Sequence, residues 1–391
     1  MRTLALTMIV LMVAGTAVAG ELTLPAAIEA ALAGHPELLA ARADVEAARA
    51  DARQAGAWSN PAAFLRLEAA PYDGDFWNDA GRIVGLSQEI PLSGRRGAAR
   101  GVGEAAAQVA GLDLEGRTHV LEARVRRAYA RAWHAQQAVV MRGEAGATAD
   151  ELLALVRRRA DAGDAAEMTV LRARMAASSV QADLLAEQSR RTGALAELSA
   201  LLDRPLTSDV TLAAMEFGDE LLPDGEATGV RAALARVEAE AATVSLAGRQ
   251  RWPDLELEAG LRTAPDGDAF DAGLRVVLPL WDRGSARMQA ARARRSASEH
   301  LADATRRAVS TARQTAVARR AAARSALKMH QESVVPDAEA ALAAVRAAFD
   351  AGDVTLSEVL QVSREWIDAR LAQLDWAREV ALAEADLVEV R

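Results

Sequence analysis

The chain has 391 residues, enough for about two or three ordinary domains or one elongated one. Its formal net charge of -9 at pH 7 argues against nucleic-acid binding, and the absence of cysteine excludes disulfides, thiolate metal ligands and a cysteine nucleophile. Only 4% of the residues are aromatic, and alanine, leucine, arginine and glutamate dominate, a composition typical of long helices packed at close distance.

Residues 1–19 have the layout of a cleaved secretory signal peptide. Arg2 gives a basic start, residues 4–13 are apolar, and residues 17–19 form an Ala-x-Ala cleavage site. About ten apolar residues are too few to span ~30 Å of hydrocarbon as a helix, which disfavours a membrane anchor. No later segment reaches about 18 uninterrupted apolar residues, so we expect an exported chain without a transmembrane helix.

Two stretches with a period of two residues interrupt the helical patterning. Apolar residues recur at every second position through 255–261 and again through 270–280, on either side of a Pro/Asp/Gly loop at 263–269. A counterpart occupies about 62–92. This alternation predicts two β-hairpins, at about 62–92 and 254–280.

The two hairpins belong to an internal duplication. Landmarks recur in the same order about 190 residues apart: Pro61 and Pro253, Pro91 and Pro279, Val45-Glu46-Ala47 and Val237-Glu238-Ala239, Ala162-Gly163-Asp164 and Ala351-Gly352-Asp353. We therefore expect a first structural repeat at 20–203, a linker at 204–225 and a second repeat at 226–391.

Each repeat reads as helix, hairpin, very long helix, tight turn and helix. The long helices are expected at about 94–160 and 284–349, with breaks near Gly143 and Gly146 in the first and at Val335-Pro336 in the second. A run of about 70 residues would be ~100 Å long, which favours a coiled coil. Each long helix is expected to pack against two shorter ones stacked end to end, and the linker is expected to add a small strand.

The two hairpins supply four strands of about ten residues each, which is the length that a tilted strand needs to cross a bilayer. Four strands cannot close a barrel, and open sheet edges are not tolerated in lipid, so closure demands oligomerisation. Trp58, Trp252 and Trp281 lie at the helix-proximal strand ends, where an aromatic girdle is expected. The alternative is a pair of soluble hairpins that cap a helical protein.

The chain resembles the TolC-like outer-membrane efflux family over nearly its whole mature length. The resemblance is carried by the duplicated unit and three segments: Glu89-Ile-Pro-Leu-Ser-Gly-Arg-Arg96, Leu278-Pro-Leu-Trp-Asp-Arg-Gly284 and Ala351-Gly-Asp-Val-Thr-Leu-Ser-Glu-Val-Leu360. It implies a mainly α-helical fold with a membrane β-barrel. In that fold a homotrimer supplies four strands per protomer to a 12-stranded outer-membrane barrel, above a long α-helical coiled-coil barrel in the periplasm.

The same resemblance implies partners and a cargo class. The partners would be a periplasmic adaptor protein, an inner-membrane pump of the RND type and outer-membrane lipid. The apolar-proline-Gly-Arg pattern is most similar to the heavy-metal cation branch of the family. Many members carry a lipid-modified cysteine at the mature N-terminus, and because this chain has no cysteine we expect no lipid anchor.

The two Ala-Gly-Asp turns are the first candidates for function. Their glycines can end a helix in the left-handed conformation, which by itself explains them structurally. By resemblance, Glu358 matches an acidic position lining the closed entrance, and Gln361 falls where some members have a second acidic residue. Four apolar tip residues are expected to be exposed and would serve adaptor docking or the hairpin's own packing: Met168, Leu171, Val354 and Leu356. The gate and adaptor-docking positions are therefore Gly163, Asp164, Thr169, Leu171, Arg172, Gly352, Asp353, Leu356, Glu358 and Gln361.

The polar strand positions are expected to line the barrel lumen: Arg66, Glu68, Glu256, Glu258, Asp271 and Arg275. The histidines show no pair at ligand spacing, and each is expected to be a surface or interhelical residue: His35, His119, His134, His300 and His330. No nucleophile elbow, P-loop, dinucleotide fingerprint or zinc motif is present, so neither an enzyme nor a cofactor is expected.

The sequence thus predicts a passive exit channel in the outer membrane of a Gram-negative bacterium, within a tripartite efflux system that exports heavy-metal cations. Export of organic compounds or type I protein secretion is the alternative within the channel class. A soluble periplasmic coiled-coil scaffold is the alternative from another class.

Overall fold

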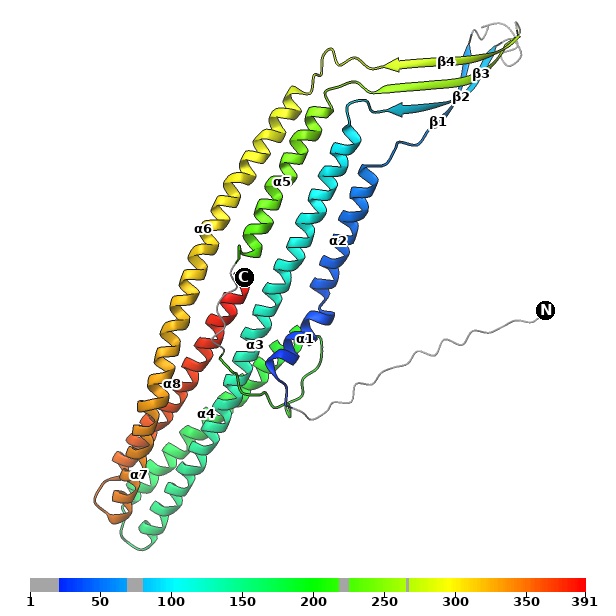
Figure 1. Cartoon of the computed structure of the whole chain (residues 1–391). Coiled ribbons are helices and arrows are strands. Elements are labelled where there is room, and N and C mark those ends of the chain that lie inside the picture. The colour runs from blue at the N-terminus through cyan, green and yellow to red at the C-terminus, as the bar shows by residue number, and fades with distance from the viewer. Residues whose placement is uncertain (1–20, 69–79, 218–224, 265–266) are drawn as a thin grey trace, which may run out of the picture. The chain divides into compact units, whose positions relative to one another are not determined.

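The computed structural model describes residues 21–68, 80–217, 225–264 and 267–391, so the expected signal peptide lies outside the described residues. The helices are α1 (Leu24–Gly34), α2 (Pro36–Ala55), α3 (Arg95–Asp161), α4 (Glu167–Leu202), α5 (Thr228–Arg249), α6 (Ser285–Met329), the π-helical turn η1 (His330–Val334), α7 (Val335–Ala351) and α8 (Leu356–Glu389) (Figure 1). The strands are β1 (Ala62–Glu68), β2 (Gly81–Ile90), β3 (Leu255–Ala264) and β4 (Gly267–Val276). Within the described residues, no helix combines the length and the apolar character needed to cross a membrane.

The strands form a single antiparallel sheet in the order β1-β2-β3-β4. The two hairpins join through β2 and β3, whose register runs from Arg82↔Thr263 to Ile90↔Leu255. The second hairpin has a shorter connection than the loop at 263–269 that we expected, because both strands extend into it. The strand β4 ends at Val276 and not at 280, because Val276 pairs with Leu255, the first residue of β3.

The long helices begin at equivalent glycines. Gly94 precedes α3 and Gly284 lies just before α6, and both have φ of +69°. Each glycine carbonyl accepts the first hydrogen bond of its helix, at 3.1 Å from the Ala98 nitrogen and 3.0 Å from the Met288 nitrogen. A residue with a β-carbon would be strained at this φ, so these two glycines fix where the chain turns from strand to helix.

The expected break at Gly143 and Gly146 is wrong, because α3 continues through both for 67 residues. A helical glycine costs only about 1 kcal/mol and keeps its N–H. The expected break before Pro336 takes the form of η1, in which the Val335 N–H bonds to the carbonyl of His330. A wider turn there accommodates a proline that has no N–H and would clash with the preceding turn.

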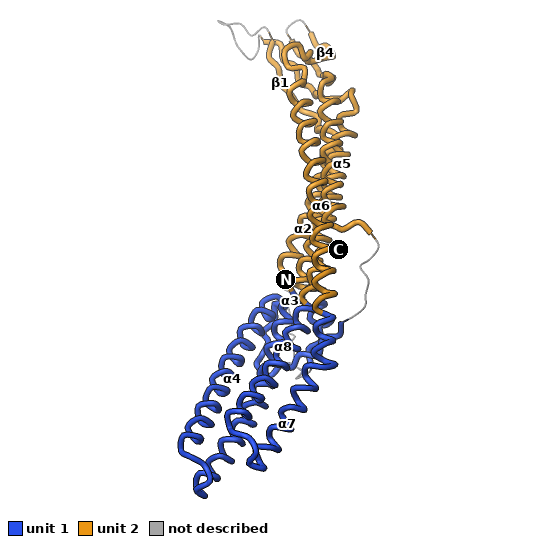
Figure 2. Tube along the Cα trace, turned by 90° about the vertical axis from the view of Figure 1, so that its left-hand side faces the viewer, with its two compact units in different colours: residues 1–31, 125–218, 324–381 blue, residues 32–124, 219–323, 382–391 orange. Residues whose placement is uncertain are grey.

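The chain divides into two compact units, which Figure 2 colours separately. Unit 1 comprises Met1–Ala31, Val125–Gly218 and Arg324–Ala381; unit 2 comprises Leu32–Arg124, Asp219–Ala323 and Leu382–Arg391. Each unit therefore takes segments from both halves of the duplicated sequence. Unit 2 contains the sheet, and there α2 and α3 approach so closely that a β-carbon at Gly103 would lie 2.5 Å from the Cα of Ala52.

In unit 1 the linker meets the N-terminal segment. Leu22 and Leu212 form an isolated parallel bridge, which is shorter than the small strand that we expected. The Tyr129 hydroxyl lies 2.8 Å from the Leu22 carbonyl oxygen and 2.9 Å from that of Ala213, so that it can donate to either. Burial raises the pKa of Tyr129 to about 12, which keeps this hydroxyl protonated.

Candidate functional site

The sheet has one polar and one apolar face. Residues directly opposite each other in an antiparallel ladder point to the same side, and successive residues of a strand point to opposite sides. The register therefore places all six residues predicted to line a lumen on one face, which we call the polar face: Arg66 and Glu68 on β1, Glu256 and Glu258 on β3, and Asp271 and Arg275 on β4. Glu89 of β2 and Arg262 of β3 lie on the same face.

The opposite face, the apolar face, carries large side chains that the chain itself does not cover. These are Leu65, Val84, Leu86, Leu257, Leu261, Phe270, Leu274 and Val276. Phe270 is 71% exposed and Leu274 66% exposed. A contiguous apolar surface of this kind belongs against lipid or a partner, not in water.

The charges on the polar face form a ladder of ion pairs across the strands. Glu258 accepts from Arg66 at 2.7 Å through Oε2 and from Arg275 at 2.6 Å through Oε1, so both of its oxygens are engaged. Arg275 also reaches Glu256 at 3.0 Å. Only 11% of the Glu258 side chain is exposed, and this carboxylate is therefore the centre of the ladder.

Two facing glycines make room for this ladder. Gly85 and Gly260 pair across β2 and β3 on the polar face. A β-carbon at Gly85 would come within 2.7 Å of Cζ of Phe64, and the Arg66 guanidinium lies 5.2 Å from the centre of the same ring. The phenylalanine and arginine side chains can therefore lie flat across the sheet, which brings Arg66 from β1 to Glu258 on β3.

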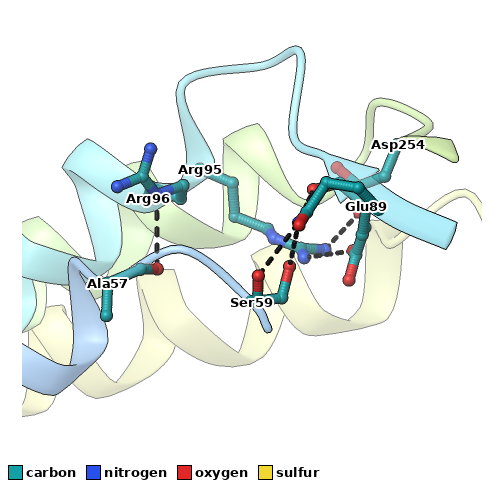
Figure 3. Close-up of polar contacts among 7 residues, drawn as sticks. Ala57, Ser59, Glu89, Arg95, Arg96 and Asp254 are labelled. Carbon is teal, nitrogen blue, oxygen red and sulfur yellow. Dashed lines mark hydrogen bonds and ion pairs between the residues drawn. The ribbon is translucent and has the colours of Figure 1, made fainter. Parts of the chain in front are cut away.

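Arg95, the first residue of α3, binds the ends of two strands (Figure 3). Its guanidinium pairs with Glu89 at the end of β2, at 2.8 Å, and with Asp254 just before β3. One guanidinium therefore joins two carboxylates where the sheet meets the helices. This contact explains the charged positions of the Glu89–Arg96 segment.

Arg96 secures the other side of the junction. It donates to the carbonyl oxygen of Ala57 at 3.3 Å (Figure 3) and to that of Gly56 at 2.8 Å, at the C-terminal end of α2. Its guanidinium also lies 3.9 Å from the centre of the Trp58 ring. Trp58, Trp252 and Trp281 are all exposed, Trp281 by 93%, at the helix-proximal strand ends where an aromatic girdle was expected.

The two Ala-Gly-Asp turns have the same backbone structure. Gly163 and Gly352 have φ of +84° and +88°. The N–H of Asp164 bonds to the carbonyl of residue 159 at 2.8 Å, and that of Asp353 bonds to residue 348 at 2.9 Å. These six-to-one bonds after a left-handed glycine are Schellman motifs, and they end α3 and α7 alike.

The two tips differ in how the next helix begins. At the second tip the Glu358 carboxylate accepts the Thr355 N–H at 2.6 Å and its hydroxyl at 3.0 Å, while the Thr355 hydroxyl accepts the Glu358 N–H at 3.4 Å. This is a capping box. At the first tip Ala166 occupies the N-cap position and makes no side-chain cap, and Thr169 stands where Glu358 stands at the second.

The capping role makes α8 sensitive to acid. The Thr355 N–H and hydroxyl lower the pKa of Glu358. A folded pKa below the unfolded one means that the carboxylate stabilises the helix start above the unfolded pKa and loses this effect as pH falls through the folded pKa. At acid pH we expect amide hydrogen exchange of residues 356–359, corrected for intrinsic rates, to rise in the native chain. Glu358→Gln should remove this pH dependence, and the uncapped first tip serves as the internal control.

Not every predicted tip residue is available to a partner. Leu356 is only 5% exposed and packs with Leu153, Val156, Phe349 and Val359, so the expectation that it is exposed is wrong. It belongs to the hairpin's own hydrophobic core, which was the alternative role for the apolar tip residues. In the first tip, by contrast, Met168 is 60% exposed and Leu171 is 41% exposed.

Arginines connect the two tips. Arg172 of the first tip donates to the Ser357 hydroxyl at 3.3 Å, from α4 to α8. Arg159 donates to the carbonyl of Phe349 at 3.2 Å and lies 4.7 Å from the centre of that ring. Gln361 bonds to Glu365 at 3.0 Å on its own helix.

Two of the histidines take structural positions. His35 accepts the Glu37 N–H at the start of α2, and His134 pairs with Asp375 at 2.9 Å between α3 and α8. Burial lowers the pKa of His134, with Arg378 acting in the same direction. Across the described ranges, histidine, aspartate and glutamate side chains nowhere gather in a group of three or more able to hold a metal ion.

Sequence reasoning missed several of the residues that organise these sites. In the sequence, Arg95 and Arg96 stand out only as part of the segment that carries the family resemblance. The capping box at Thr355 and Glu358 was legible as Thr-x-x-Glu before an apolar run. The role of Phe64 had no local signal, since its neighbour Gly85 pairs with a strand from the other half of the chain.

Comparison with known proteins shows which family the chain matches. A family model described as outer membrane efflux protein matches residues 27–204 and 226–390. The chain is 30% identical over 308 residues to the nickel-cobalt-cadmium resistance protein NccC of Alcaligenes xylosoxydans xylosoxydans, covering 75% of this chain and 69% of that protein. It is 32% identical over 313 residues to the nickel and cobalt resistance protein CnrC of Cupriavidus metallidurans, covering 76% and 73%.

Solved structures show the same fold. The CmeC outer membrane channel of Campylobacter jejuni resembles this chain with a TM-score of 0.81 at 15% sequence identity, over 94% of this chain and 85% of that one.

Proposed function

The chain belongs to the outer membrane efflux protein family, and from this premise we propose that it is the exit duct through which heavy-metal cations leave the cell. It is an outer-membrane protein with a periplasmic helical extension. The proposal that the cargo is a heavy-metal cation rests on one observation. Three quarters of the chain are similar to relatives named for nickel, cobalt and cadmium resistance. Energy for transport would come from an inner-membrane pump, because the chain has no nucleotide-binding motif.

The assembly that we propose is a homotrimer. The sheet has β1 and β4 as its two edges, and an open edge within lipid leaves backbone N–H and C=O groups unsatisfied. Three copies would supply 12 strands, enough for a closed barrel. The apolar face would then meet outer-membrane lipid, and the polar face would line the lumen.

The partners that we propose act at the tips of the two helical hairpins. Proteins of this family work with an adaptor and an inner-membrane pump in tripartite systems. The exposed Met168 and Leu171 offer apolar contacts to a periplasmic adaptor, and an RND pump would feed the duct. The gate would comprise Gly163, Asp164, Thr169, Arg172, Gly352, Asp353, Glu358 and Gln361. Opening would begin by breaking the contact between Arg172 and Ser357.

The test is metal tolerance. Deletion of the gene from its bacterium should lower tolerance to nickel, cobalt, cadmium or zinc salts, and the native gene should restore it. Tolerance to dyes and detergents should stay unchanged. The reverse pattern, with lost tolerance to organic compounds alone, would assign the duct to organic export, and loss of a secreted protein would assign it to type I secretion.

A soluble periplasmic scaffold fits the molecule poorly. Its location in the outer membrane and the uncovered apolar face both argue against it.

A further inference from the structure

The polar face of the sheet carries several carboxylates, and most of them pair with arginines. Carboxylate oxygens are ligands for divalent metal ions, which need them deprotonated and with a lone pair free. Glu256 and Glu258 lie two residues apart on the same face of β3, a spacing that would let both reach one ion. Instead, both point to arginines.

Both oxygens of Glu258 are engaged by arginines. Arg66 holds Oε2 at 2.7 Å and Arg275 holds Oε1 at 2.6 Å, from the strands on opposite sides of β3. Charge-assisted pairs of this geometry are the strong class of hydrogen bond. A cation would have to displace a guanidinium from a carboxylate whose side chain is 11% exposed.

The neighbouring carboxylates are compensated in the same way. Arg275 also holds Glu256 at 3.0 Å. Arg262 approaches Glu68 to 3.9 Å. On the described strands, Asp271 is the acidic residue of the polar face that has no arginine within ion-pair distance. One such carboxylate per chain attracts cations without forming a chelating group.

We propose that Arg66 and Arg275 keep the polar face from capturing the divalent cations that pass it. This inference rests on the proposed function, because only a metal-exporting duct has this need. A duct conducts when its sites bind weakly enough for the ion to leave. A pair of free glutamates on each chain would hold Ni2+ or Co2+ at the exit and slow its release. The arginines therefore help the ion to pass, because they prevent these glutamates from forming a metal-binding site.

Nickel binding to the purified full-length protein in detergent tests this role. In the native protein the arginines occupy Glu258, so this residue should not contribute to Ni2+ binding. Isothermal titration with Ni2+ should therefore give the same isotherm for native protein and for Glu258→Gln. The Arg66→Gln/Arg275→Gln variant should bind Ni2+ at least about tenfold more tightly, because it loses two positive charges next to the carboxylates. Adding Glu258→Gln to that variant should remove the gain.

The matched controls separate charge from folding. Arg82→Gln removes an arginine from the same sheet but from the apolar face, and it should not increase Ni2+ binding. Arg66→Lys/Arg275→Lys keeps both charges and should bind no more Ni2+ than native protein. If the double glutamine variant fails to assemble, Arg275→Gln alone frees Glu256 together with Oε1 of Glu258, and this pair of carboxylates should still raise Ni2+ binding.

Two results would overturn the proposal. The first is a fall in the Ni2+ binding of otherwise native protein when Glu258 is replaced. The second is a double arginine variant that assembles correctly and shows no gain in Ni2+ binding. Neither depends on what the cell exports, because the titration uses purified protein. A failed tolerance experiment would leave the titration unchanged, and so the two proposals fail separately.

Discussion

Phe270→Arg is expected to prevent stable assembly of the sheet in the outer membrane, whereas the same change at the neighbouring Ala269 is expected to be tolerated. Phe270 lies on the apolar face and is 71% exposed, and Ala269 lies on the polar face of the same strand. An arginine facing lipid costs about 2–4 kcal/mol near the bilayer centre, and a trimer would bear this cost three times. The amount of assembled protein in outer-membrane fractions, read from the heat-sensitive oligomer on gels, measures the effect.

The adjacent pair of substitutions makes this comparison specific. Both variants add the same charge, one residue apart, so a general effect on expression or export would appear in both. Equal loss at the two positions would contradict the assignment of the faces. Normal assembly of Phe270→Arg would show that this face meets water.

Arg95→Ala is expected to destabilise the junction between sheet and helices by about 2 kcal/mol. The change leaves the carboxylates of Glu89 and Asp254 facing each other without the guanidinium that joins them. Arg100→Ala is the control, because its pair with Glu104 on the same helix is largely exposed and should contribute less than about 0.5 kcal/mol. The midpoint of thermal dissociation of the assembled protein reports the difference.

A double-mutant cycle identifies the cause of this loss. In a Glu89→Gln/Asp254→Asn background the two side chains no longer repel each other, so removing Arg95 should cost about 1 kcal/mol less than in the native chain. An equal cost in both backgrounds would mean that Arg95 acts through packing alone. Arg95→Lys should retain part of the stability, since it keeps the charge but cannot engage both carboxylates in the same fork geometry.

The patterns that predicted structure correctly were local ones. The alternation in 255–261 assigned β3 and its two faces, because the period of a strand is set by its own backbone. The turns at Gly163 and Gly352 were predicted from a left-handed requirement that glycine meets without strain. The six polar-face positions followed from the same alternation.

Predictions failed where a local rule left out a competing energy, or where packing against distant segments set the exposure of a residue. Gly143 and Gly146 do not break α3, because the cost of glycine in a helix is small compared with the hydrogen bonds of a continuous ladder. Leu356 is buried, although its place beside a tip turn suggested exposure. Its partners Leu153 and Val156 are about 200 residues away in sequence, so no local window contains them.

The sequence by itself determined the main helices and strands, the two glycine turns and which residues of each strand share a face, since each of these follows from neighbours along the chain. Only the tertiary structure decided which charges meet. Arg66 and Glu258 are 192 residues apart, and they pair because β2 and β3 join the two hairpins into one sheet and two facing glycines clear the path between them. An ion pair needs a distance of a few ångströms, and between segments so far apart in sequence only folding sets that distance.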